Sequence, residues 1–86
     1  MARAMRLQVG EAGVLKPGVN VQFCGESRRR DGVWRSYSVI YVSRKGAFED
    51  VCFADVCVHP AGGRKLTDRQ ARARAKRIVA AERARR

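Results

Sequence analysis

The sequence predicts an α+β fold, in which a small antiparallel β-sheet of three or four strands, open or closed into a small barrel, precedes one C-terminal α-helix. Three observations support this. Apolar and polar residues alternate in runs between residues 19 and 58, turn signals separate those runs, and a segment rich in Ala and Arg follows residue 66. With 86 residues, the chain has room for a single domain at 1–86, β-rich at about 5–59, with a linker at 60–66 and a basic helix at 67–84.

Three segments have strand patterns. Residues 19–24 alternate with a period of two, residues 33–43 are rich in β-branched and aromatic side chains, and residues 47–58 predict a third strand. The loop at 27–32 contains an Asp31-Gly32 pair, which favours a hairpin, and residues 44–46 predict a second tight turn. A weaker alternation at 6–9 is a candidate edge strand.

The helix is predicted from its start signal and its composition. The breaker cluster at 59–63 ends the sheet, and Thr67 followed three residues later by Gln70 matches a capping box. Asp68 falls in the first turn, where the helix dipole favours a carboxylate. Ala, Arg, Lys and Glu, which fill most of the remaining positions, are good helix formers.

A helical projection separates two arcs. Ala71, Ala75, Ile78 and Val79, joined by Ala81, form an apolar arc that can pack on the sheet. A second arc of roughly 60°, extending about 20 Å along the axis, contains four cations and suits a run of phosphates or an acidic groove. These are Arg69, Arg72, Lys76 and Arg83. The alternative is a solvated outer face.

The charge of the chain points to an anionic partner. The net charge is +11, and residues 64–86 hold ten basic residues against two acids. Such a surface suits nucleic acid, DNA or RNA, or an acidic protein or nucleoprotein complex. Arginine outnumbers lysine fifteen to four, which fits phosphate binding or a GC-rich coding genome. We expect no membrane partner and no small-molecule substrate.

Two further groups are candidate contacts. Arg28, Arg29 and Arg30 form a second basic cluster at the first turn, and Arg44 with Lys45 a third at the second turn. Because successive turns of a meander lie at opposite ends of a sheet, the two clusters do not merge. Tyr37 and Tyr41 share one strand face and could stack on bases, or could form core beneath the helix.

Cysteine and histidine give no pattern typical of a metal site. Cys24, Cys52, Cys57 and His59 lack a CxxC pair, and a regular strand points Cys52 and Cys57 to opposite faces, so they could form a Cys3His zinc site only if a bulge changed that geometry. We expect buried, inert thiols and no metal or cofactor. Cys57 and His59 share a face of a regular strand, yet about 6.5–7 Å separates such positions, too far for a hydrogen bond. Phosphate-binding glycine loops and GxSxG motifs are missing, so we expect no enzyme.

Two resemblances concern architecture. The segment 15–18 leading into 19–23 is similar to the entry to many SH3-like folds. The order of three strands and a helix resembles the arm-binding domains of tyrosine integrases and the plant AP2 type. Neither includes a family-specific motif, and we assign no family.

Three functional hypotheses follow. The first is a nucleic-acid-binding module. The second is an inhibitor or adaptor of the kind found in phages and mobile elements, such as anti-CRISPR proteins, and the third is a ribosome-associated protein. Residues 1–6 have positive charge without an apolar segment behind them, unlike a secretory signal, and we expect a cytoplasmic protein.

Overall fold

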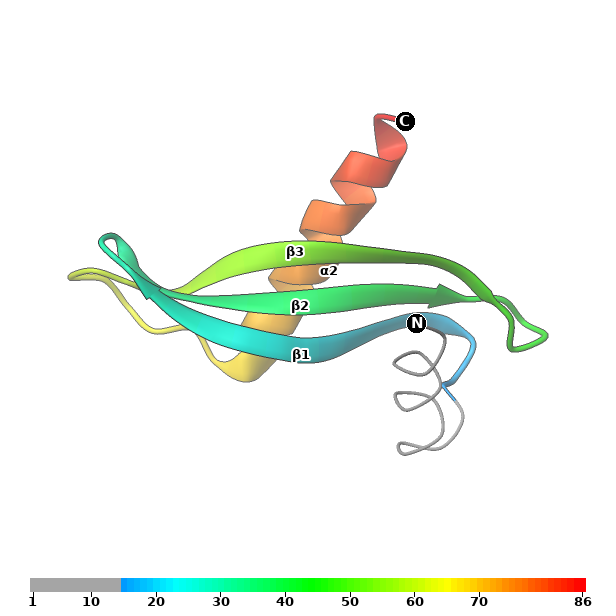
Figure 1. Cartoon of the computed structure of the whole chain (residues 1–86), viewed down its shortest axis with the longest axis horizontal. Coiled ribbons are helices and arrows are strands. Elements are labelled where there is room, and N and C mark those ends of the chain that lie inside the picture. The colour runs from blue at the N-terminus through cyan, green and yellow to red at the C-terminus, as the bar shows by residue number, and fades with distance from the viewer. Residues whose placement is uncertain (1–14) are drawn as a thin grey trace.

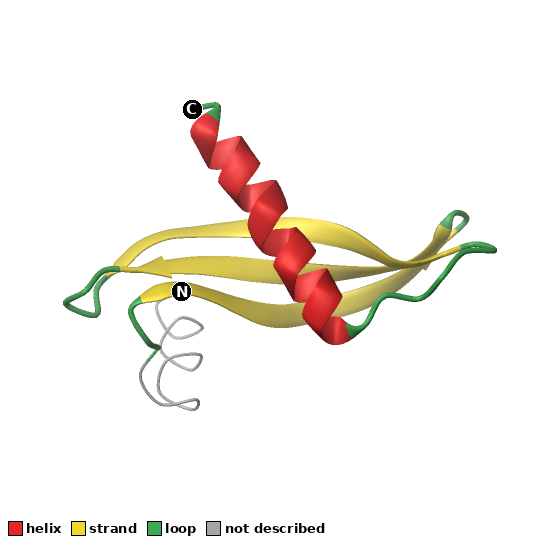
Figure 2. Ribbon diagram, turned by 180° about the vertical axis from the view of Figure 1, so that it is seen from behind, coloured by secondary structure: helices red, strands yellow, loops and turns green. Residues whose placement is uncertain are grey.

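A computed structural model describes residues 15–86 and shows an open three-stranded sheet followed by one helix. The strands β1 (Gly18–Arg29), β2 (Gly32–Val42) and β3 (Phe48–Pro60) are antiparallel and lie in the order β1-β2-β3. The helix α2 (Asp68–Ala84) crosses one face of the sheet diagonally (Figures 1 and 2). The α+β prediction is confirmed, and the barrel alternative is wrong because the sheet does not close. The candidate strand at 6–9 lies outside the described residues.

The first hairpin is longer than predicted. Arg28 and Arg29 continue β1 and pair with Val33 and Gly32, so that the turn is reduced to Arg30 and Asp31. Gly32 has a φ of 140°. The second turn is where the sequence predicts it, with Gly46 donating its backbone N–H to the Ser43 carbonyl oxygen at 2.9 Å.

Three irregularities in the strand register determine which side chains face the helix. Cys24 is an extra residue in β1 relative to β2, and Glu49 and Val58 are extra residues in β3. A β-bulge of this kind shifts the alternation of side chains between the two faces of a strand. The predicted strand positions therefore hold, but the faces of residues beyond each bulge do not follow a simple period of two.

The core lies between α2 and one face of β2 and β3. Ala71, Ala75 and Val79 of the helix are fully buried against the sheet, with Tyr37 and Val39 of β2 beneath them. Ile78 is partly buried, whereas Ala81 is exposed, so the predicted apolar arc is narrower than the projection indicated. Alanine at two of the three buried helix positions allows the helix backbone to approach the sheet closely.

The start of α2 is fixed by the predicted capping box. The Thr67 hydroxyl accepts a hydrogen bond from the Gln70 N–H at 3.1 Å, and the Gln70 side chain accepts one from the Thr67 N–H at 2.9 Å. Just before the cap, the Leu66 N–H donates to the Val58 carbonyl oxygen at 2.7 Å, which ties the linker to β3.

Within residues 15–86, no helix is long and apolar enough to span a membrane.

Candidate nucleic-acid interface

Acidic side chains divide the arginines into two groups. Four carboxylates in residues 15–86 form ion pairs with five arginines, at Arg29–Asp55, Arg35–Glu26, Arg35–Asp68, Arg72–Asp68, Arg83–Asp50 and Arg86–Asp50. Each pair joins two strands, or joins the helix or the C-terminal Arg86 to the sheet, except for the pair within the first turns of α2. The paired arginines therefore belong to the framework of the fold.

Arg72 connects the first half of α2 to the sheet. Its Nε donates to Asp68 at 2.6 Å, and its NH1 donates to the Val21 carbonyl oxygen of β1 at 2.7 Å. Its guanidinium also lies over the Tyr37 ring, 5.6 Å from the ring centre. The hydrogen bond from Arg72 is the main cause that lowers the pKa of Asp68 below its usual value.

Arg83 has the same role in the last turn of α2. Its guanidinium lies 3.9 Å from the centre of the Tyr41 ring and is paired with Asp50, which Arg86 also contacts. The pKa of Asp50 is lowered first by a hydrogen bond from the Cys52 thiol, and further by the Val51 N–H and by the charges of the two arginines.

The four cations of the predicted arc on the helix therefore do not form one surface. Arg72 and Arg83 turn toward the sheet, because the carboxylates and tyrosine rings that attract them lie there. Arg69 and Lys76 remain exposed. The same exposed side of α2 also presents Arg74 and Arg77, with Ala73 and Ala80 between the cations in projection. We call Arg69, Arg74, Lys76 and Arg77 the outer helix face.

Sequence reasoning missed Arg74 and Arg77 because it searched for the narrowest arc of cations. The helical projection could have identified them, because every helix residue outside the buried arc centred on Ala75 should be exposed. None of the four residues of the outer helix face forms an ion pair or side-chain hydrogen bond in the described part of the chain.

The cluster at the first turn is divided between the two faces of the sheet. Arg29 lies on the face away from α2, with its guanidinium 4.5 Å from the centre of the Trp34 ring and 3.4 Å from Asp55. Arg28 lies on the helix side, and Arg30 is exposed in the turn. Alternation along β1 explains this division, because Arg28 and Arg29 are successive strand residues. The turn between β2 and β3, which contains Arg44 and Lys45, lies at the other end of the sheet (Figure 1).

The two tyrosines belong to the helix-covered face. Tyr37 is fully buried, and its hydroxyl donates to Asp68 at 3.2 Å, so its ring has no exposed face for a base. Tyr41 is partly buried beneath Arg83. This placement agrees with the core alternative for Tyr37. Tyr41 also lines an open groove of about 450 Å³ beside the helix, together with Val19, Ala73, Lys76, Arg77 and Ala80.

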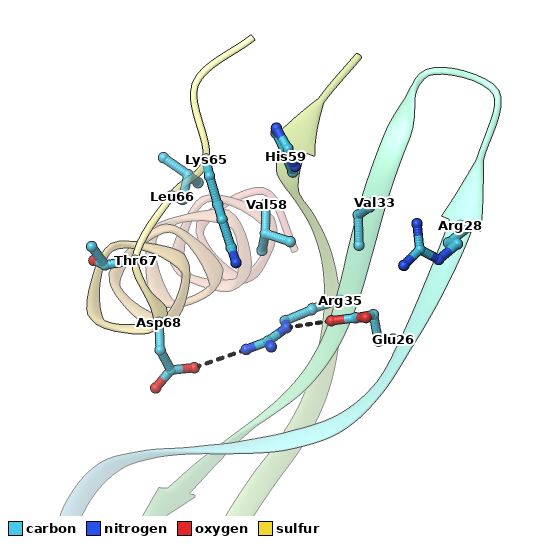
Figure 3. A pocket seen from close by; sticks show the side chains of 10 residues that line it. All are labelled: Glu26, Arg28, Val33, Arg35, Val58, His59, Lys65, Leu66, Thr67 and Asp68. Carbon is cyan, nitrogen blue, oxygen red and sulfur yellow. Dashed lines mark hydrogen bonds and ion pairs between the residues drawn. The ribbon is translucent and has the colours of Figure 1, made fainter. Parts of the chain in front are cut away.

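A cleft of about 460 Å³ lies where the first hairpin, the end of β3 and the linker meet (Figure 3). Charged side chains and an imidazole line it, namely Glu26, Arg28, Arg35, His59, Lys65 and Asp68. Val33, Val58 and Leu66 supply its apolar lining. We call it the end cleft. The linker reaches this end because β3 runs antiparallel to β2, and the Ala61 N–H donates to the Asp31 carbonyl oxygen at 2.9 Å.

The cysteines and His59 do not converge. Cys52 is buried beneath α2 as expected, whereas Cys57 is partly buried opposite Trp34 on the other face. The expectation of a buried thiol is wrong for Cys24, which is exposed at its bulge. The expectation that Cys57 and His59 share a face is wrong, since the bulge at Val58 places His59 opposite Val33 and into the end cleft. No group of three or more His, Cys, Asp or Glu side chains in residues 15–86 is arranged to hold a metal ion.

No protein-family model, curated protein or solved structure matches this chain.

Proposed function

We propose that this protein is a non-enzymatic nucleic-acid-binding module that contacts phosphates through the outer helix face. The observation that carries the proposal is the division of the cations. Arginines needed by the fold are paired with carboxylates, whereas Arg69, Arg74, Lys76 and Arg77 are all exposed and form no ion pair within residues 15–86. Lysine and arginine side chains in this arrangement bind backbone phosphates without regard to base sequence.

The arrangement of the outer helix face supports a polyanion over a single anion. Ala73 and Ala80 separate the cations and present small side chains, so that a bulky strand can approach the helix closely. Arg28, Arg30, Arg64 and Lys65 add exposed charge at the end of the sheet next to the start of the helix. A strand that follows the helix toward its N-terminus would therefore meet more cations.

Binding to duplex DNA and to single-stranded RNA at increasing salt concentration tests the proposal. Four phosphate contacts predict a slope of about −3 to −4 in a plot of log affinity against log salt concentration on duplex DNA. The variant with Arg69, Arg74, Lys76 and Arg77 all changed to Gln should lose most of this slope. A wild-type protein that binds neither polymer at about 50 mM salt, or binds without salt dependence, would contradict the proposal.

An acidic partner protein is the second candidate, and the groove beside the helix favours it. Its lining combines apolar surface from Val19 and Tyr41 with the cations Lys76 and Arg77, which suits a partner segment with alternating acidic and apolar residues. A protein inhibitor or adaptor would use this surface. Affinity purification with and without nuclease separates the two candidates, because only a direct protein complex survives nuclease treatment.

A further inference from the structure

The end cleft has more positive charge than its own carboxylates can neutralise. Arg35 lies in the middle and binds both acids, with Nε 3.0 Å from Glu26 and NH1 3.4 Å from Asp68 (Figure 3). Asp68 additionally accepts hydrogen bonds from Arg72 and from the Tyr37 hydroxyl. The two carboxylates are therefore already engaged by groups of the fold.

Arg28 and Lys65 are left as the cations that can bind a ligand. Figure 3 shows Lys65 extending from the linker on one side of the cleft, and Arg28 projecting from β1 on the other side. Neither side chain forms an ion pair or a hydrogen bond with the rest of residues 15–86. Arg28 offers up to five N–H donors and Lys65 up to three, so each side of the cleft has a cation that can bind a phosphate group.

The remaining walls suit a flat, partly apolar group. Val33, Val58 and Leu66 line the cleft, and the imidazole of His59 adds a planar ring with hydrogen-bonding nitrogens. The volume of about 460 Å³ falls within the range of roughly 300–1,000 Å³ that is typical of small-ligand pockets. An isolated phosphate or carboxylate would leave the apolar lining unoccupied.

We propose that the end cleft binds one unstacked nucleotide, with the base against Val33 and Val58 in the middle of the cleft and the phosphate bound by Arg28 or Lys65 at one side. This inference rests on the proposed function, because it assigns the cleft to a nucleotide of the same nucleic-acid ligand. The chemistry is that of a nucleoside 5′-monophosphate, whether free or at a strand end. The proposal does not use the N-terminus of α2, where the Thr67 hydroxyl accepts a hydrogen bond from the Gln70 N–H.

Titration with adenosine 5′-monophosphate, followed by amide NMR, tests the cleft directly. We expect saturable shifts at residues 28, 33, 59, 65 and 66, and binding at least about tenfold weaker for adenosine alone and for inorganic phosphate alone, because each lacks one half of the ligand. Shifts that do not saturate, or that spread evenly over the basic surface, would overturn the proposal.

A matched pair of variants separates the cleft from general charge. The double variant Arg28→Gln with Lys65→Gln should weaken binding of the nucleotide by about tenfold or more. The double variant Arg44→Gln with Lys45→Gln removes the same charge at the opposite end of the sheet, and should leave the affinity within about twofold. If both double variants weaken mononucleotide binding equally, the nucleotide is attracted only by the net charge of the protein, and the proposed site is wrong.

Two further outcomes distinguish a failure of the cleft proposal from a failure of the proposed function. If the chain binds polymers with the expected salt slope but ignores the mononucleotide, the cleft proposal fails and the proposed function stands. If the mononucleotide saturates the cleft but no polymer binds at about 50 mM salt, the proposed function fails and the site stands. A short acidic peptide that binds the cleft more tightly than the mononucleotide would replace the nucleotide with a protein ligand, and would also overturn the proposal.

Discussion

The guanidinium carbon of Arg83 lies 3.9 Å from the centre of the Tyr41 ring, on the sheet face that α2 covers. Arg72 makes the same kind of contact with Tyr37, which lies on the same face of β2, at 5.6 Å from the ring centre. Each arginine is also paired with an aspartate, Asp50 or Asp68. Two such contacts, one near each end of the helix, fix the angle at which α2 crosses the sheet.

Removal of the Arg83 side chain should lower the free energy of unfolding. A cation held over an aromatic ring at a partly exposed site contributes about 1 kcal/mol, so Arg83→Ala should lower the Tm by roughly 4–8 °C in a domain of this size. The Tm of Arg83→Lys should lie between the Tm values of the wild type and of Arg83→Ala, because an ammonium group keeps the positive charge but is not planar and cannot stack on the ring. Thermal unfolding followed by circular dichroism measures the difference.

The neighbouring Arg85 provides the control for Arg83. It is exposed, and its side chain contacts no acid or ring among residues 15–86. Arg85→Ala removes one positive charge at the same end of the helix and should leave the Tm nearly unchanged. If both variants lose the same stability, then net charge and not the Tyr41 contact is responsible.

The local elements were predictable from the sequence because local chemistry determines them. Three strand segments, the turn at Gly46 and the Thr67–Gln70 capping box all follow from short patterns, and the structure confirms them. The direction of Arg72 and Arg83 was not predictable in this way. It depends on Asp50, Tyr37 and Tyr41, which approach the helix only after the sheet has formed.

The end cleft was predictable from the sequence only in part. The three-strand meander requires β3 to end beside the first turn, so the position of the linker's start at this end of the sheet follows from topology alone. The position of Lys65 also depends on the hydrogen bond from the Leu66 N–H to the Val58 carbonyl oxygen. The bulge at Val58 does not follow from topology, since no glycine or other local signal marks it in the sequence. That bulge decides that His59 enters the cleft and that Cys57 does not.

A larger side chain at a buried alanine should separate α2 from the sheet. Ala75 is fully buried between α2 and the sheet, and Ala75→Leu inserts three carbon atoms there, which should cost about 1–3 kcal/mol in unfolding free energy. Ala81→Leu makes the same change at an exposed position and should cost much less. Urea denaturation compares the two, and a similar loss at both sites would contradict the observed packing of the helix.

Acid should weaken the contact between Asp68 and the arginines. The pKa of Asp68 is lowered in the folded protein, chiefly by the hydrogen bond from Arg72, relative to about 3.9 in an unfolded chain. Its contribution to stability is therefore fully present above about pH 5, and is lost as the pH falls through the lower folded value. Stability should decrease between pH 6 and pH 3.

The variant Asp68→Asn isolates this residue from the other acids. Asp50 and Asp55 also have lowered pKa values, the latter chiefly through the Ser36 hydroxyl, so the wild type should lose stability from all three. Asp68→Asn should be less stable than the wild type at pH 6, and the two curves should converge as the pH approaches the folded value. A constant difference in Tm across this range would show that the charge of Asp68 has no role.

Gly32 should tolerate no side chain, because the backbone at the end of β3 lies directly against its α-carbon. Its φ of 140° is unfavourable for L-residues, and a β-carbon there would overlap the His59 carbonyl oxygen and lie 2.9 Å from the Pro60 Cα. Gly32→Ala should therefore cost at least about 1–3 kcal/mol. Gly25→Ala is the matched control, since no described atom beyond its own two chain neighbours lies within 4 Å of the added carbon. Because the displaced backbone carries His59, Gly32→Ala should also weaken mononucleotide binding, and unchanged stability and binding would show that the hairpin and β3 are not this close.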